Sequence, residues 1–250
     1  MIYFQSMEQT PNKYTLDVLR YAAQQSEAWD KIRLGKFTAS TIHNLMSDPR
    51  SKADKEAGKL SQSAQKYCIQ KAMELLTGES QEDAFGRAID WGNEWEQHAL
   101  GELEKALAGK IFLDNFIIEH KPPFKLFNDY SGCSSDAVIK NRIGEVLMVI
   151  EMKCPFNSVN HYLHSTVECG DDLLEVNSDY YYQVQMNCLI HGATAGIFAS
   201  YDPRQPEHRR LNWCRIEADI DVMEDICVRM EIARAKVEEI VNNWNQYPTR

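Results

Sequence analysis

Three residues in the middle of the chain have the types and the spacing of a site that could cleave phosphodiester bonds. Asp136 is followed, after a gap of fourteen residues, by Glu151 and, two positions further on, by Lys153. Residues 146–150 (VLMVI) are apolar and partly β-branched, which predicts a buried strand. Because side chains alternate along a strand, Glu151 and Lys153 are expected on one face. Two carboxylates converging from neighbouring strands could bind Mg²⁺, and the lysine beside them could hold or deprotonate an attacking water.

This spacing also has a common structural explanation. An aspartate and a Glu-x-Lys pair with a loose gap occur by chance in many proteins, usually as a salt bridge on an ordinary strand. Further matching residues are needed before the pattern indicates a nuclease.

Seven short blocks along the chain supply such residues. In order, they are 29–35 (WDKIRLG), 38–40 (TAS), 91–96 (WGNEWE), 135–136 (SD), 151–156 (EMKCPF), 183–185 (QVQ) and 201–204 (YDPR). Together they resemble the lambda-type alkaline exonucleases of phage recombination systems, members of the PD-(D/E)xK nuclease superfamily. The likeness runs from about residue 26 to residue 215. The family's usual Pro-Asp is here Ser135-Asp136, and Ala137 stands where a glycine is common, but neither change removes a ligand.

The resemblance implies both a fold and an activity. The fold would be α/β, with a PD-(D/E)xK (restriction-endonuclease-like) core in which a central mixed β-sheet is flanked by helices. The activity would be that of a Mg-dependent 5′→3′ double-stranded DNA exonuclease. Such an enzyme releases 5′-mononucleotides and leaves 3′ single-stranded overhangs for phage-type recombination by strand annealing.

Carboxylate side chains are expected to bind the metal. Asp136 and Glu151 would be the metal ligands, and the backbone carbonyl of Met152 could supply a further oxygen. By the resemblance, Glu96 would bring a third carboxylate from a long helix. Two Mg²⁺ ions, for which Mn²⁺ could substitute, would stabilise the attacking and leaving oxygens.

Two further side chains would complete the catalytic group. Lys153 would position or activate the attacking water and offset charge on the phosphorus. Gln183 resembles the family's active-site glutamine, and it would orient the lysine or the water.

Residues nearer the N-terminus are expected to bind the DNA end. In the family, an arginine and a serine seven residues apart bind the terminal 5′-phosphate, and Arg33 and Ser40 have this interval, with Trp29 in its matching place. Guanidinium and hydroxyl donors suit a phosphate dianion. Arg50 could add a second contact, and Ile89 could be a wedge that separates the last base pairs. The alternatives are a solvent-exposed loop arginine and a core isoleucine.

The expected partners follow from the resemblance alone. They are double-stranded DNA ends, two further copies of the chain in a homotrimeric ring, and a single-strand annealing protein. No periodicity in the sequence reports the ring contact.

Length and composition indicate one ordinary domain. The chain has 250 residues, of which 44% are hydrophobic and 26% charged. Residues 1–6 have the character of an expression-tag remnant, so 7–250 is expected to form a single exonuclease domain. No apolar run approaches the length of a membrane span and no secretory signal is evident, which favours a cytoplasmic protein of a bacterium or a prophage. The odd number of cysteines suits reduced thiols, with Cys133 and Cys154 as packing residues rather than metal ligands.

The net charge of −10 is unusual for a protein that would bind DNA. Because fields are local, a basic groove remains compatible with an acidic total. Basic residues gather between positions 31 and 59, and a solvated face of mixed charge is the alternative reading of that cluster.

Hydrophobic periodicity predicts alternating elements. Helices are expected at 13–25, 38–46, 61–76, 86–108, 178–191 and 219–244, and strands at 111–119, 132–139, 145–152, 195–201 and 211–217. Residues 47–52 are expected to form a polar loop of low order that lasts until the helix at 61. Strands framed by helices favour a mixed α/β sandwich.

Three points stay open. The segment 168–179 is acidic and has no chemical role that the sequence indicates. His161 and His164 have helical spacing but lack a third metal partner, so they are expected to be surface or core residues. As alternatives to the exonuclease, the chain could be an endonuclease of the same superfamily or a catalytically silent DNA-end-binding module.

Overall fold

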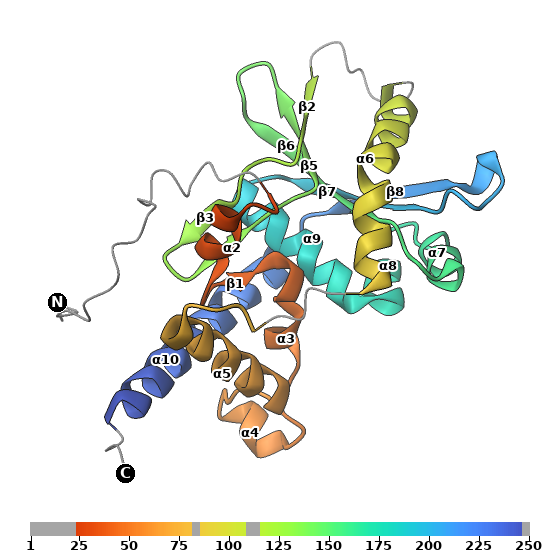
Figure 1. Ribbon diagram of the computed structural model, residues 1–250. Helices are drawn as coiled ribbons and strands as arrows, with labels where there is room; N and C mark the ends of the chain where they lie inside the picture. The colour runs from red at the N-terminus through yellow and green to blue at the C-terminus, as the bar shows by residue number, and fades with distance from the viewer. Residues whose placement is uncertain (1–23, 82–85, 109–115, 247–250) are drawn as a thin grey trace.

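A five-stranded mixed sheet forms the centre of the computed structural model, which describes residues 24–81, 86–108 and 116–246. Its strands lie in the order β2-β5-β6-β7-β8 (Figure 1). Their bounds are Phe116–His120 for β2, Ala137–Asn141 for β5, Val146–Lys153 for β6, Ala195–Tyr201 for β7 and Leu211–Glu217 for β8. Only β6 and β7 are parallel; the other neighbours are antiparallel. The expected mixed sheet is therefore confirmed.

Helices cover both faces of this sheet. On one face, α6 (Arg87–Ala108) packs Leu103 and Leu107 against Ile150 of β6. On the other face, α9 (Ser178–His191) packs Val184 against Val149. Because neighbouring residues of β6 face opposite helices, the sheet is buried on both sides.

Local sequence explains why α9 begins and ends where it does. The side chain of Asn177 caps the N-terminus by accepting a hydrogen bond from the amide of Tyr180. At the other end, Gly192 has a φ of 68°, a left-handed conformation that glycine adopts without strain. The predicted bounds of this helix, 178–191, are confirmed.

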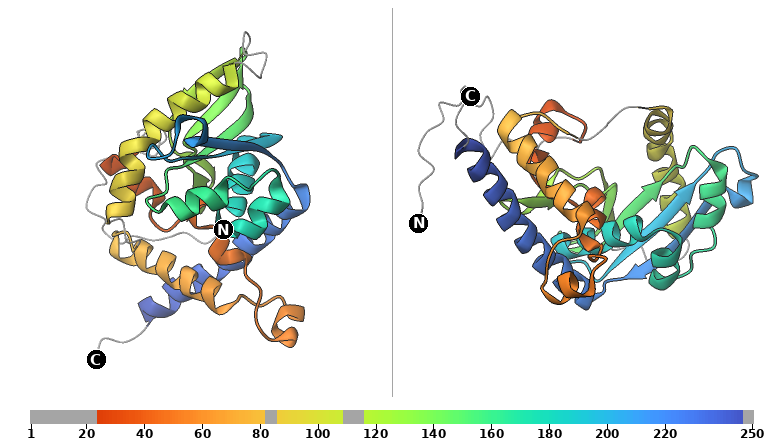
Figure 2. Two further views of the ribbon diagram at one scale, coloured as in Figure 1. Left: turned by 90° about the vertical axis from the view of Figure 1, so that its right-hand side faces the viewer. Right: turned by 90° about the horizontal axis from the view of Figure 1, so that it is seen from below.

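A smaller three-stranded sheet lies beside the first, in the order β1-β4-β3. Its strands are β1 (Phe37–Thr38), β4 (Ser131–Cys133) and β3 (Lys125–Asn128). Around it are α2 (Glu27–Arg33), the short 3₁₀ helix η1 (Ala39–Thr41), α3 (His43–Met46), α4 (Lys52–Glu56), α5 (Gln62–Thr77) and α10 (Ile220–Gln246). Side chains of α3, α5, α9 and α10 share one core here, and α5 and α10 lie side by side (Figures 1 and 2).

The remaining described elements lie near the end of the large sheet. They are α7 (Ser158–His164), α8 (Gly170–Val176) and η3 (Glu207–Arg209). The carboxylate of Asp172 accepts the backbone amides of Glu168 and Cys169, so part of the acidic segment serves to cap α8.

The prediction of one continuous strand at 132–139 is wrong. The chain leaves the small sheet after Cys133 and enters the large one at Ala137, so two strands replace the single one expected. Between them, the hydroxyl of Ser134 accepts the indole N–H of Trp29, and the carbonyl of Ser135 accepts the side-chain amide of Gln24. Contacts with the N-terminal segment therefore take the place of a continuous strand ladder.

Two other element predictions need correction. The helix expected at 38–46 is divided into η1 and α3, and the region expected as a loop before residue 61 contains α4, which the Ser51 hydroxyl caps. The helix expected at 13–25 falls almost wholly outside the described residues, as do the first five residues of the strand expected at 111–119.

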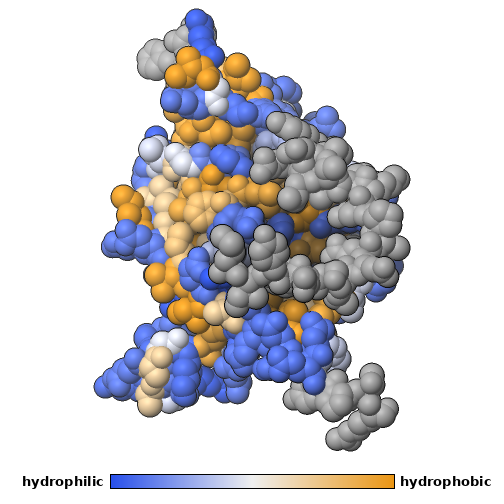
Figure 3. Space-filling view, turned by 90° about the vertical axis from the view of Figure 1, so that its left-hand side faces the viewer, coloured by the Kyte–Doolittle hydropathy of each residue, from blue (hydrophilic) through white to orange (hydrophobic). Residues whose placement is uncertain are grey.

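The surface is mixed in polarity. Apolar residues form a broad area in the middle of the face in Figure 3, and hydrophilic residues lie at its upper and lower ends. None of the helices in the described part of the chain has both the length and the apolarity that a bilayer crossing requires.

Candidate active site

Glu151 and Lys153 project from the same face of β6, as expected from strand alternation. The Lys153 ammonium lies 2.6 Å from Glu151 Oε1. The second carboxylate oxygen, Oε2, accepts a hydrogen bond of 3.1 Å from the side-chain amide of Asn187 on α9. The Glu151 carboxylate is 1% exposed, so these two contacts hold it in a site nearly closed to water.

Asp136 joins this pair from the start of β5. Its Oδ2 accepts a hydrogen bond of 2.7 Å from the backbone amide of Met152, between Glu151 and Lys153. Ala137 pairs with Ile150 in the sheet, so Met152 lies beyond the last rung of the β5–β6 ladder. The aspartate therefore takes the place of the next rung and comes to lie beside Glu151.

Glu96 reaches the same region from α6. Its side chain is 18% exposed and pairs with the ammonium of Lys121 at 3.0 Å. The backbone amide of Lys121 donates in turn to the carbonyl of Asp136, which connects Glu96 to the loop before β5.

The ammonium of Lys153 has two further neighbours, both on α9. The carbonyl oxygen of Gln183 accepts a hydrogen bond from it at 3.2 Å. The ring of Tyr180 lies under it, 4.4 Å from ammonium nitrogen to ring centre. Such a cation–π contact stabilises a charged ammonium in a site with little water.

Burial and mutual repulsion shift the carboxylates away from their ionised forms. Removal from water, followed by the charges of Glu151 and Glu96, raises the pKa of Asp136 well above its usual value. Burial also raises the pKa of Glu151, although Lys153 opposes that rise. The pKa of Lys153 moves upward too, because Glu151 and Asp136 outweigh the effect of burial. The two carboxylates therefore favour the charged form of the lysine.

This donor set fits a divalent cation. The charges of Glu151 and Glu96 disfavour the ionised form of Asp136, the charge of Glu96 disfavours that of Glu151, and a dication would supply the missing positive charge. All are hard oxygen donors of the kind that Mg²⁺ prefers. Within the described ranges, no three His, Cys, Asp or Glu side chains form a ready-made metal cluster, and Glu151 and Glu96 are each paired with a lysine.

Two of the residues expected to bind the DNA end, Trp29 and Arg33, lie near the segment that leads into Asp136. The Trp29 indole donates to the Ser134 hydroxyl at 2.8 Å, two residues before Asp136. The guanidinium of Arg33 stacks over the ring of Trp29, 4.2 Å from its centre. Both residues belong to α2, so one helix joins the expected phosphate site to the carboxylates.

The other expected DNA contacts are spread more widely. Ser40 is exposed on η1, and its hydroxyl lies 3.2 Å from that of Thr38. Arg50 is exposed just before α4, and Ile89 is 40% exposed in the first turn of α6, which rules out a core role for Ile89. Within the described part of the chain, no hydrogen bond or ion pair ties Arg50 or Ile89 to the other site residues, so their roles stay predictions.

The cluster of basic residues between 31 and 59 is largely neutralised locally. Pairs within 4 Å join Lys31 to Glu27, Lys52 to Glu56, Lys55 to Asp48 and Lys59 to Asp54. A face of mixed charge, the alternative reading, describes this region better than a basic groove.

The histidine and cysteine predictions hold. His161 and His164 are buried, and both hydrogen-bond the hydroxyl of Ser200 through Nδ1, so they are core residues. Cys133 is buried in the core and Cys154 packs against the cluster that contains Met152, so both lie where a packing role was expected, and burial raises the pKa of both thiols to about 12.

Sequence reasoning missed four residues that contact the site: Asn187, Tyr180, Ser134 and Lys121. Helical periodicity could have found two of them, because Asn187 follows Gln183 by four positions and Tyr180 precedes it by three. No local pattern indicates Ser134 or Lys121, which reach the site through contacts between distant segments.

Comparison with known proteins identifies a family. The family model described as the YqaJ-like viral recombinase domain matches residues 28–194. No curated protein sequence matched the chain.

Three solved structures share the fold. An alkaline exonuclease from Laribacter hongkongensis (LHK-Exo) has a TM-score of 0.67 and 21% identity, covering 88% of this chain and 97% of its own. The same exonuclease in complex with dAMP has a TM-score of 0.68, 22% identity and the same coverage. A phage-related exonuclease from Haemophilus somnus 129PT has a TM-score of 0.67 and 19% identity, covering 84% of this chain and 96% of its own.

Proposed function

We propose that this chain, which belongs to the family of YqaJ-like viral recombinase domains, is a Mg²⁺-dependent 5′→3′ exonuclease acting on double-stranded DNA. Family and fold support a nuclease role in recombination. The observation that carries the finer proposal is the meeting of Asp136, Glu151 and Lys153, with Arg33 and Trp29 attached to the same centre through Ser134.

The chain's own residues divide the catalytic work. The Lys153 ammonium, held by Glu151, Gln183 and the ring of Tyr180, stabilises negative charge that develops on the phosphate. Gln183 fixes the direction of that ammonium and can orient the attacking water. Asn187 keeps the Glu151 carboxylate from rotating toward the lysine with both oxygens.

The metal would be held by Asp136 and Glu151, with the carbonyl of Met152 and the carboxylate of Glu96 as further ligands. Two Mg²⁺ ions, replaceable by Mn²⁺, would supply Lewis-acid activation of the phosphate. Glu96 would have to exchange its ion pair with Lys121 for the metal.

The direction of digestion would be set by recognition of a terminal 5′-phosphate. Arg33 supplies a guanidinium, and Ser40 supplies an exposed hydroxyl. A terminal phosphate carries more charge than an internal diester, so these donors favour a phosphorylated end. Arg50 as a second contact and Ile89 as a base-pair wedge complete the proposal. The products would be 5′-mononucleotides and a 3′ single-stranded overhang.

We further propose that the enzyme acts as a homotrimeric ring around the duplex and hands its single strand to an annealing protein. Sedimentation with and without a DNA end tests the first part of this proposal. A monomer under both conditions would exclude the ring.

Digestion of duplexes labelled at either end tests the proposed reaction. With Mg²⁺, a 5′ label on a phosphorylated duplex should be released at once as a mononucleotide, and chelator should stop the release. A 3′ label should remain on long fragments until late in the reaction, and covalently closed circles should stay intact. Cleavage of closed circles favours the endonuclease alternative, and end binding without release of nucleotides favours a silent binding module.

A further inference from the structure

The helix α5 holds the segment between Arg33 and Ser40 at both of its ends. At one end, the carboxylate of Glu74 accepts the backbone amide of Gly35 at 2.9 Å. At the other end, the hydroxyl of Tyr67 lies 2.6 Å from that of Thr41. Arg33 and Ser40 each lie within two residues of one of these anchors.

The Glu74 anchor is a buried ion pair. The Glu74 carboxylate and the Lys71 ammonium, 3.1 Å apart, are each 2% exposed. The second oxygen of Glu74 accepts the backbone amide of Gln81, so one carboxylate ties two loops to α5. Because a buried pair is costly to assemble, it holds its geometry well once its hydrogen bonds are satisfied.

The turn that follows Arg33 requires this support. Gly35 has a φ of 68°, which glycine adopts readily and other residues avoid. Its amide points at Glu74, and Phe37 then donates its amide to the carbonyl of Tyr130 at the start of β1. The ring of Phe37 packs against that of Tyr67, with centres 5.6 Å apart. The path from Arg33 to Ser40 is therefore set by α5.

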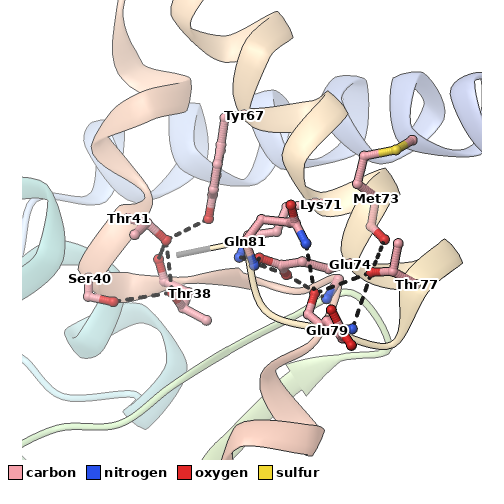
Figure 4. Close-up of polar contacts among 11 residues, drawn as sticks. Thr38, Ser40, Thr41, Tyr67, Lys71, Met73, Glu74, Thr77, Glu79 and Gln81 are labelled. Atoms are coloured by element: carbon pink, nitrogen blue, oxygen red, sulfur yellow. Dashed lines mark hydrogen bonds and ion pairs between the residues drawn. The ribbon is translucent and has the colours of Figure 1, made fainter. Parts of the chain in front are cut away.

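The hydroxyl of Tyr67 begins a row of four hydrogen-bonded hydroxyl groups. From Tyr67 the row passes to Thr41 at 2.6 Å, to Thr38 at 2.9 Å and to Ser40 at 3.2 Å (Figure 4). Each hydroxyl donates one proton. When Tyr67 donates to Thr41 and each group donates to the next, the proton of Ser40 is left for an acceptor in solvent.

We infer that Tyr67, Lys71 and Glu74 are positioning residues for recognition of the terminal 5′-phosphate. Glu74, neutralised by Lys71, fixes the turn that aims Arg33, and Tyr67 orients the row of hydroxyls so that Ser40 donates to a phosphate oxygen. This inference rests on the proposed function, since it assigns a scaffold to the phosphate site that the proposal places at Arg33 and Ser40.

The test compares kcat/KM on 5′-phosphorylated and 5′-hydroxyl duplexes, as a ratio, in variants of α5. Tyr67→Phe removes one oxygen and should lower the ratio about two- to tenfold, the range expected when one neutral hydrogen bond is lost from the row. Lys71→Met/Glu74→Leu removes both charges together and should lower it at least as much. Lys71→Met/Glu74→Gln keeps an acceptor for Gly35 and should restore most of the preference.

Two controls on the same helix separate positioning from general loosening. Gln65→Ala removes a hydrogen bond from an exposed side chain of α5 to the carbonyl of Leu60, which involves neither the row of hydroxyls nor Glu74. Cys68→Ala opens space in the core beside Tyr67. Both should keep the wild-type ratio. The losses in the Tyr67 and Lys71/Glu74 variants should fall on KM for phosphorylated ends, and the rise of preference as the phosphate ionises near pH 6 should flatten.

The outcomes are distinct. A wild-type enzyme without preference for phosphorylated ends would overturn both the phosphate site and this inference. A wild-type preference that Arg33→Ala abolishes while Tyr67→Phe leaves it intact overturns the inference alone. If the double variants do not fold, Tyr67→Phe still decides, because it changes a single atom.

Discussion

The ammonium of Lys153 lies 2.6 Å from Oε1 of Glu151, its neighbour on the same face of β6. The contact is an ion pair between a carboxylate that burial drives toward protonation and an ammonium that the carboxylates hold in its charged form. The pair therefore places a positive charge beside Glu151, where it can offset negative charge on a bound phosphate.

Removal of the lysine should stop cleavage without preventing binding. Lys153→Ala deletes the ammonium that pairs with Glu151, and should lower kcat by about a hundred- to a thousandfold or more. Single-turnover digestion and gel shift on the same duplex measure the two effects. Lys105→Ala, an exposed lysine paired with Glu102, is the control. Turnover retained in Lys153→Ala would show that the catalytic assignment is misplaced.

Tyr180 should act through its ring rather than its hydroxyl. Tyr180→Phe keeps the aromatic face under Lys153 and should retain near-normal kcat, whereas Tyr180→Leu should lower kcat about three- to thirtyfold, the range of a desolvated cation–π contact. The pH–rate profiles of the two variants supply a second readout. Equal rates for both variants would remove the ring from this role.

Arg33 should govern the choice of DNA end. Arg33→Ala should lower the ratio of rates on phosphorylated and hydroxyl ends about tenfold or more, because it removes charged hydrogen bonds to the phosphate. Lys31→Ala, on the same helix but paired with Glu27, is the matched control and should leave the ratio unchanged. An unaltered ratio in Arg33→Ala would exclude that residue from phosphate binding.

Binding of Mg²⁺ should increase the free energy of unfolding. Mg²⁺ at about a hundred times its dissociation constant should stabilise the wild type by about 2.7 kcal/mol, and Asp136→Asn should lose most of this effect. Without metal, Asp136→Asn should be no less stable than the wild type, since Asn keeps the acceptor for the amide of Met152 and removes a buried charge. Thermal unfolding in chelator and in Mg²⁺ gives both values.

Without metal, Asp136 should make the free energy of unfolding depend on pH in a defined direction. The pKa of Asp136 is higher in the folded chain than in the unfolded one, so the folded chain holds the extra proton between the two values. Its contribution to stability therefore falls as pH rises through that window. In Asp136→Asn this contribution should vanish, and an identical slope for the two proteins would contradict it.

His164 should have the opposite effect on the pH dependence of stability, which should rise with pH. Burial lowers the pKa of this histidine to about 4, below its usual 6.5, so the unfolded chain binds the proton first as pH falls. Stability should decrease between pH 6.5 and pH 4, by about 2 kcal/mol at pH 5 relative to pH 7.5. Urea unfolding of His164→Gln should show a smaller decrease than the wild type. Parallel curves would mean that His164 is not buried as a neutral ring.

Local patterns were sufficient for much of the fold. The expected strands at 195–201 and 211–217 and the helix at 178–191 match β7, β8 and α9, because alternation, capping and helix-ending glycine are properties of adjacent residues. The prediction failed at 132–139, where the chain changes sheets. That change depends on Trp29 and Gln24, which lie more than a hundred residues earlier in the sequence.

The sequence by itself determined that Glu151 and Lys153 share a face of one strand, since a period of two residues is built into the extended backbone. Only the tertiary structure decided that Asp136 caps the ladder beside them, that Glu96 approaches from α6, and that α5 holds the turn between Arg33 and Ser40. These relations depend on the order of the strands and on buried hydrogen bonds between distant segments, which no local pattern records.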